Sequence, residues 1–205
     1  MTSGLTKQSK TLTPKQESMI LGYLADRRNS LRNRIMFLLS CKSGLRAKEI
    51  SGLKWKNLLT DEIEVGDTIH LTNDISKGKN GGRVIPIHKT LKPLLQELLE
   101  IHSKRIRGNK TALYETSLIQ TERSKSATPQ VIVNFFHNLY KDLGLIGYSS
   151  HSGRRTFITN TARKVSTVGG SLRDIQYLAG HSTLQTTQRY IDHDSESQRK
   201  VVDLI

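Results

Sequence analysis

HSGRRT at residues 151–156, LAGHST at residues 178–183 and QRY at residues 188–190 form the stretch from which the fold of this chain can be argued. Apolar residues at helical spacing lie within residues 156–165 and again within residues 172–178. We therefore expect three successive helical segments, which present two histidines, an arginine and a tyrosine in that order.

The spacing within these segments suits the binding of a phosphate. His151 and Arg154 are three residues apart, so they share one face at the start of a helix. The free N–H groups of a helix start also favour an anion. His181 and then Tyr190 follow on the next two segments. Cationic donors around a phosphate, followed by a phenol that can attack it, predict phosphoryl transfer to tyrosine.

A further arginine lies much earlier, in SGLRAKEI at residues 43–50. Gly44 is typical of the left-handed residue that ends a helix, which places Arg46 in the turn before the next helix, at residues 47–53. A guanidinium in a turn can reach a ligand; the alternative is a surface arginine or an ion pair with Glu49. We favour the ligand role for Arg46, with Glu49 as an accessory residue that orients its neighbours.

This order of residues resembles the catalytic domain of the tyrosine recombinase (phage integrase) family. The family pattern is an early Arg, a later His-x-x-Arg, a Gly-His and a Tyr nine residues on, and the resemblance covers about residues 12–205. It implies a mainly α fold with a small antiparallel β-sheet (α+β). It also implies a site-specific DNA recombinase or integrase that cleaves and rejoins strands through a 3′-phosphotyrosine. The alternatives are a non-catalytic DNA-binding regulator or architectural protein derived from a recombinase, and a type IB-like DNA relaxing enzyme.

The expected catalytic residues divide by their chemistry. Two guanidiniums and an imidazole would bind the non-bridging oxygens, a phenol would attack, a second imidazole would handle its proton, and a lysine would protonate the leaving oxygen. A phenol has a pKa of about 10, so it needs a nearby base or a cationic field. The family places its lysine in a β-hairpin, where Lys77 matches best and Lys79 is the alternative. The predicted set is Arg46, Lys77, His151, Arg154, His181 and Tyr190.

Tyr177 is a competing phenol. It lies in the apolar-patterned segment before Gly180, so we expect it to be packed and favour Tyr190 as the nucleophile.

The composition predicts a polyanionic partner. Lys and Arg total 32 against 18 Asp and Glu, and the formal net charge is +14. The charge alone leaves DNA, RNA and an anionic membrane as candidates. The resemblance implies double-stranded DNA, bound by a homotetramer on paired sites with accessory DNA-bending proteins, whereas a monomer is compatible with the absence of DNA. The candidate DNA contacts are Lys79, Arg83, Arg155, Lys104, Arg105 and Arg107, with solvated charges as the alternative.

Other classes of protein are disfavoured. The chain has no apolar run of membrane-spanning length and no signal peptide, so we expect a cytoplasmic protein. The single Cys41 excludes an intramolecular disulfide and predicts a core residue. We expect no cofactor and no metal, and interpret Asp192-His193-Asp194 as charge flanking the nucleophile.

Helix-capping residues, prolines, glycines and alternating apolar residues predict the remaining elements. Thr13-Pro14 and Thr128-Pro129 each open a helix, and a second helix begins near Ser30. Alternating residues at 69–74 and 84–87 predict strands joined by a glycine-rich hairpin at 76–83. A helix at 90–101 should lead into a basic linker at 102–110, and residues 113–120 are ambiguous.

The domain organisation is expected to be simple. Residues 1–11 are predicted to be a flexible basic leader and residues 12–205 one catalytic domain, without the N-terminal core-binding domain of most family members. Residues 195–205 would dock on a neighbouring subunit or on their own domain. Gly153 and Arg155 depart from the family's His-x-Leu-Arg-His, which leaves the local helix packing open.

Overall fold

The structure, a computed structural model, describes residues 9–76, 82–107 and 109–190. In chain order its elements are α1 (Pro14–Ala25), α2 (Ser30–Ser43), α3 (Ala47–Gly52), η1 (Trp55–Asn57), β1 (Thr68–Leu71), β2 (Arg83–Pro86), α4 (Lys92–Ile106), α5 (Lys110–Glu115), α6 (Pro129–Asp142), α7 (Ser152–Lys164), η2 (Val165–Val168), α8 (Leu172–Ala179) and α9 (Leu184–Gln188). The predicted mainly α fold with a small antiparallel sheet is confirmed.

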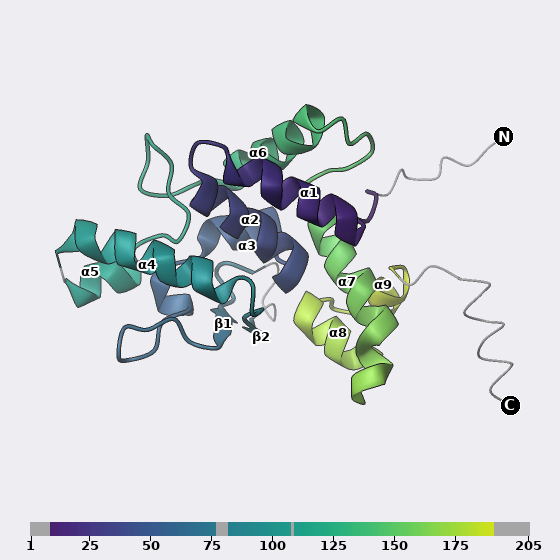
Figure 1. The fold of residues 1–205 in the computed structure, drawn as a ribbon. Helices are drawn as coiled ribbons and strands as arrows, with labels where there is room; N and C mark the ends of the chain where they lie inside the picture. Colours follow the sequence, from purple (N-terminus) through teal and green to yellow (C-terminus); the bar gives the residue numbers. More distant parts are fainter. Residues whose placement is uncertain (1–8, 77–81, 108, 191–205) are drawn as a thin grey trace, which may run out of the picture.

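The helix α2 is the centre of the molecule. It lies among α1, α3 and α7, while α4 and α5 extend to one side and α8 and α9 to the other (Figure 1). Its residues from Ile35 to Cys41 are all buried, as a helix surrounded by other helices requires. The predicted core position of Cys41 is therefore confirmed.

The predicted helix boundaries hold where capping residues mark them. Thr13 and Gln16 bond reciprocally, side chain to backbone, at the start of α1, and the Thr128 hydroxyl accepts from Val131 N–H at the start of α6. Gly44 has a φ of 65° and ends α2 as predicted. A Cβ at Gly44 would meet the ring of Phe157, so α7 also approaches closely here.

The two strands pair in antiparallel register, with Ile69 opposite Ile85 and Leu71 opposite Arg83. Ile69, Leu71 and Ile85 are buried, so one face of this small sheet joins the core. Lys77 and Lys79 lie outside the described residues, and so do residues 195–205.

Two boundary predictions need correction. The helix α4 runs on to Ile106, so Lys104 and Arg105 lie in its last turn, not in a linker. Lys and Arg are good helix formers, and their charge suits a helix C-terminus, so a basic run does not end a helix. Residues 9 and 10 also pack on the body, because the Lys10 N–H donates to the Gly147 carbonyl at 3.1 Å.

No helix within the described ranges combines the length and the apolar character that crossing a membrane requires.

Candidate active site

His151 immediately precedes α7 and Arg154 lies in its first turn, so both are at the start of a helix as the sequence predicts. Gly153 lies between them and makes this position possible, since a Cβ there would collide with Ser40 Oγ and Cys41 Sγ of α2. The absent family Leu is thus explained by close helix packing. Arg154 is only 3% exposed, whereas His151 is exposed.

Glu49 sits between two arginines. The Glu49 carboxylate accepts from Arg46 Nη1 at 3.0 Å and from the Arg46 backbone N–H at 2.8 Å. Arg83 donates to both carboxylate oxygens, at 3.0 and 3.2 Å. Burial by itself raises the pKa of Glu49, but the hydrogen bonds and charge of Arg83, followed by Arg46, outweigh it and lower the pKa. Glu49 is therefore a carboxylate at neutral pH.

Arg83 is placed differently from the sequence-based expectation. It was a candidate DNA contact, but it is 4% exposed and its guanidinium faces Glu49. Its Nε also donates to the Leu178 carbonyl at 2.8 Å. In this structure Arg83 joins strand β2 to the segment that carries His181, and it is not a surface cation.

Three guanidiniums converge on the C-terminus of α8. Besides Arg83 at Leu178, Arg154 donates to the Ala179 carbonyl at 2.5 Å and Arg46 to the Gly180 carbonyl at 3.4 Å. The last carbonyls of a helix have no intrahelical partner and carry partial negative charge, so cations stabilise them. The guanidiniums of Arg46 and Arg154 are therefore bound to the two residues that immediately precede His181 in the sequence.

Gly180 is the left-handed end of α8, with a φ of 60°. A Cβ at this position would lie 2.7 Å from Arg83 Nη1, so the close approach of the guanidinium also needs glycine.

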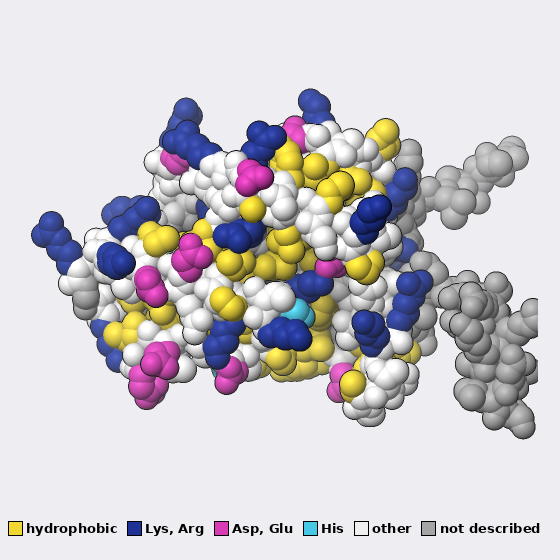
Figure 2. Space-filling model, in the orientation of Figure 1, with side chains coloured by type: hydrophobic (Ala, Val, Ile, Leu, Met, Phe, Trp, Pro, Cys, Tyr) yellow, Lys and Arg dark blue, Asp and Glu magenta, His cyan; other side chains and the backbone are white. Residues whose placement is uncertain are grey.

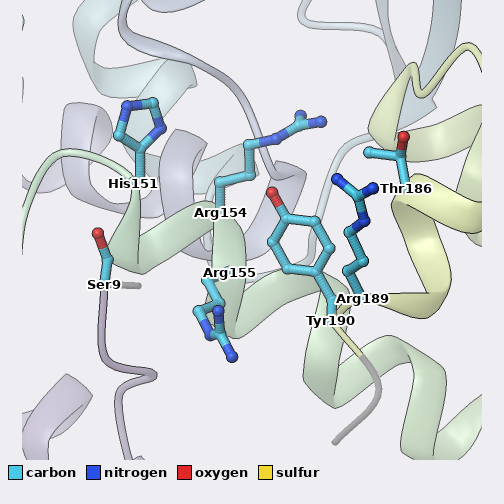
Figure 3. Close-up of a pocket in the computed structure, with 7 residues that line it drawn as sticks. All are labelled: Ser9, His151, Arg154, Arg155, Thr186, Arg189 and Tyr190. Atoms are coloured by element: carbon cyan, nitrogen blue, oxygen red, sulfur yellow. The ribbon is translucent and has the colours of Figure 1, made fainter. Parts of the chain in front are cut away.

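The Tyr190 ring packs against the catalytic candidates. It stacks on the His181 ring with centroids 5.4 Å apart and planes 22° apart, and Arg155 lies 5.7 Å from its centroid. Tyr190 shares a hollow of about 250 Å³ with His151 and Arg154, toward which its hydroxyl end points (Figure 3). The structure thus brings Arg46, His151, Arg154, His181 and Tyr190 into one region.

Both histidines have lowered pKa values, which favours the neutral imidazole. His151 stays exposed to solvent, but its partial desolvation, followed by the charges of Arg154 and Arg46, lowers its pKa. The same causes, with Arg83 in addition, lower the pKa of His181 to about 4. Burial followed by Arg46 also lowers the pKa of Arg154, to about 10, which leaves it a cation at neutral pH.

Other candidates lie elsewhere. Lys104, Arg105 and Arg107 are exposed at the end of α4, on the side of the molecule away from α7 to α9 (Figure 1). Tyr177 is 54% exposed, so the expectation that it is packed was wrong; its hydroxyl accepts from the Val84 N–H at 3.2 Å.

The hollow also contains residues that the sequence interpretation missed. Ser9, Thr186 and Arg189 line it, and the Thr187 hydroxyl is hydrogen-bonded to Nδ1 of His181. Their proximity to Tyr190 in the sequence was the available signal for three of them, whereas nothing local marks Ser9.

The Phage integrase family matches residues 10–197. The chain belongs to this family. Among curated members it is similar to the tyrosine recombinase XerC of Roseiflexus sp. (strain RS-1), 29% identical over 195 residues, which are 92% of this chain and 58% of the relative. It is likewise 29% identical to the tyrosine recombinase XerA of Pyrococcus horikoshii, over 95% of this chain and 60% of that relative.

Solved structures of an integrase and a recombinase share the fold. The Tn1549 transposon integrase in complex with a circular intermediate DNA superposes with a TM-score of 0.74 at 21% identity, covering 99% of this chain and 68% of that chain. XerA recombinase gives a TM-score of 0.70 at 20% identity, covering 100% and 66%. The chain thus spans about three fifths of the length of the curated relatives it matches.

Proposed function

We propose that the chain is the catalytic domain of a site-specific DNA recombinase, in which Tyr190 attacks the scissile phosphate. One observation carries the proposal: the Tyr190 ring stacks on His181 and lines the same hollow as His151 and Arg154. A phenol, two imidazoles and a guanidinium around one space are what phosphoryl transfer to tyrosine requires.

The proposed step needs no external oxidant or energy source. The Tyr190 oxygen forms a bond to phosphorus while the bond from phosphorus to the 5′ oxygen breaks, which leaves a 3′-phosphotyrosine and a free 5′ hydroxyl. His151 accepts the phenol proton, because it lines the same hollow as Tyr190 and a neutral imidazole has one unprotonated ring nitrogen. The leaving oxygen takes a proton from Lys77, with Lys79 as the alternative. Attack by another 5′ hydroxyl reverses the step and joins the strands.

Arg46 and Arg154 would neutralise the two non-bridging oxygens. Each guanidinium has five N–H donors and already uses some of them to hold Glu49, Gly44 or the end of α8. These bonds fix both guanidiniums before DNA arrives, so little reorganisation accompanies the reaction. Glu49 supports the site by orienting Arg46.

Double-stranded DNA is the proposed partner, in a homotetramer on paired sites. The net charge of +14 supports DNA as the partner, whereas the tetramer is carried over from the resemblance alone. On the face seen in Figure 2, Lys and Arg side chains are spread over the surface with acidic ones between them. Such a distribution attracts a polyanion over a broad area, so DNA affinity should fall steeply with salt.

Covalent capture tests the proposal. The protein is incubated with sheared host DNA in chelator and denatured in detergent, and DNA that remains attached is sequenced. Wild type should retain DNA, and Tyr190→Phe should not. Tyr177→Phe is the matched control, because it removes the exposed phenol, and it should retain DNA like the wild type.

Reversible binding without covalent attachment, even with host extract added, would instead support the non-catalytic DNA-binding alternative. On a supercoiled plasmid that carries the captured sequence, relaxed circles without recombinant junctions would support the DNA relaxing enzyme.

A further inference from the structure

The His181 ring contacts a second residue besides Tyr190. Its Nδ1 lies 3.0 Å from the hydroxyl oxygen of Thr187, a fully buried residue of α9. The His181 backbone is held as well, because its N–H donates to the Gln176 carbonyl and its carbonyl accepts from the Gln176 amide. The His181 backbone is therefore held by Gln176, and its ring is held by Thr187.

The direction of this hydrogen bond follows from the hydroxyl proton. Thr156 and Thr161 donate their hydroxyl protons to carbonyls four residues earlier, each at 2.8 Å. The Thr187 hydroxyl makes no such bond: among the described residues, its one hydrogen-bond partner is His181 Nδ1. A buried hydroxyl that donates to nothing is costly, so the Thr187 hydroxyl donates and Nδ1 accepts.

The charge of the His181 ring determines which ring nitrogen carries a proton. Three guanidiniums and burial keep His181 neutral, so the ring carries one proton. If Nδ1 accepts from Thr187, that proton is on Nε2. The two nitrogens point in different directions, so Nε2 is directed away from α9.

We propose that Thr187 is a positioning residue that holds His181 as the tautomer protonated on Nε2. The site then has a neutral N–H donor of fixed direction next to Tyr190. That this donor serves a phosphate oxygen rests on the proposed function, whereas the tautomer itself does not. The opposite tautomer would present a lone pair to a phosphate and repel it.

Ring nitrogen NMR tests the tautomer without any reaction. In protein labelled with ¹⁵N-histidine, long-range proton–nitrogen correlations distinguish protonated from unprotonated ring nitrogens, and His181→Gln identifies the signals. Wild type at pH 7 should show a proton on Nε2 only. Thr187→Ser keeps the hydroxyl and should show the same pattern, whereas Thr187→Val should give a mixture of tautomers. A wild-type proton on Nδ1, or an unchanged pattern in Thr187→Val, would overturn the proposal.

Covalent capture supplies the second readout. Thr187→Val should lower the rate of covalent complex formation by about tenfold or more, since a misdirected donor in such a site costs up to about 10²–10³ in rate. Thr187→Ser should restore most of it. Thr161→Val is the matched control and should retain the wild-type rate, because among the described residues the Thr161 hydroxyl bonds only to the Phe157 carbonyl on α7.

The two readouts separate the two proposals. If the tautomer follows Thr187 but wild type captures no DNA, the proposed function fails and the tautomer assignment stands. If wild type captures DNA but His181 carries its proton on Nδ1, the tautomer assignment fails alone. Should Thr187→Val not fold, the spectra of wild type and Thr187→Ser still decide.

Discussion

Arg83 shows how much of this site depends on residues that no local pattern marks. Its neighbours suggested a hairpin tip on DNA, yet its guanidinium is buried against a carboxylate 34 positions away in sequence. The pairing of Arg83 with Glu49 and the Leu178 carbonyl is a tertiary contact. Sequence spacing could therefore identify Arg46, Arg154, His181 and Tyr190 as candidates. It could not identify the role of Arg83, and it marked Thr187 only by its closeness to Tyr190.

Replacing Arg83 tests its buried role. Arg83→Gln leaves Glu49 with Arg46 as its remaining cation, so the free energy of unfolding should fall by about 3 kcal/mol, as for other broken buried pairs. Denaturant titration measures this change, and the double variant with Glu49→Gln should recover part of it. The salt dependence of DNA binding should not change. A slope reduced by about one unit would contradict the buried role and indicate a phosphate contact.

At the scale of elements, the sequence predicted most of the fold because boundary residues carry local signals. The Thr-Pro starts of α1 and α6 and the glycine that ends α2 were placed correctly. The end of α4 was misplaced because a charged run was taken for a linker. The packing of α7 on α2 could not be predicted, since it depends on which surfaces meet at Gly153.

Gly153 gives a prediction about this helix contact. Gly153→Ala should lower the free energy of unfolding by about 1–3 kcal/mol, because the added methyl group overpacks against Ser40 and Cys41. Gly22→Ala is the matched control: Gly22 lies inside α1 with open space around it, so alanine should stabilise by about 0.5–1 kcal/mol. Urea unfolding of both variants measures the contrast. Equal effects would mean that α7 and α2 do not pack this closely.

At the scale of the whole molecule, acid should weaken the fold through buried neutral histidines. The His102 Nδ1 accepts from Trp55 Nε1–H at 2.8 Å, and burial, then Arg105, lower the pKa of His102 to about 4. Since an unfolded histidine has a pKa of about 6.5, the unfolded state binds the proton first as pH falls. Stability is therefore complete above about pH 6.5 and decreases down to about pH 4.

For His102, the free energy of unfolding should fall by about 2 kcal/mol between pH 7 and pH 5, since one pH unit corresponds to about 1.4 kcal/mol. His181 has a similarly lowered pKa and should add to the loss. His102→Gln retains an acceptor for Trp55 without titrating, so its stability should depend less on pH than that of wild type. Denaturant midpoints at the two pH values measure this difference, and an identical pH dependence would contradict the buried neutral histidine.

Peptide mapping of the covalent complex is the most direct test of Tyr190 as the nucleophile. Captured complexes are treated with nuclease and trypsin, which cleaves after Arg173, Arg189 and Arg199 and so separates Tyr177 from Tyr190. Using Tyr177→Phe protein removes ambiguity from a missed cleavage at Arg189. The account predicts a nucleotide linked through its 3′ phosphate to Tyr190 in the peptide of residues 190–199. A nucleotide on any other residue, or a 5′ linkage, would contradict it.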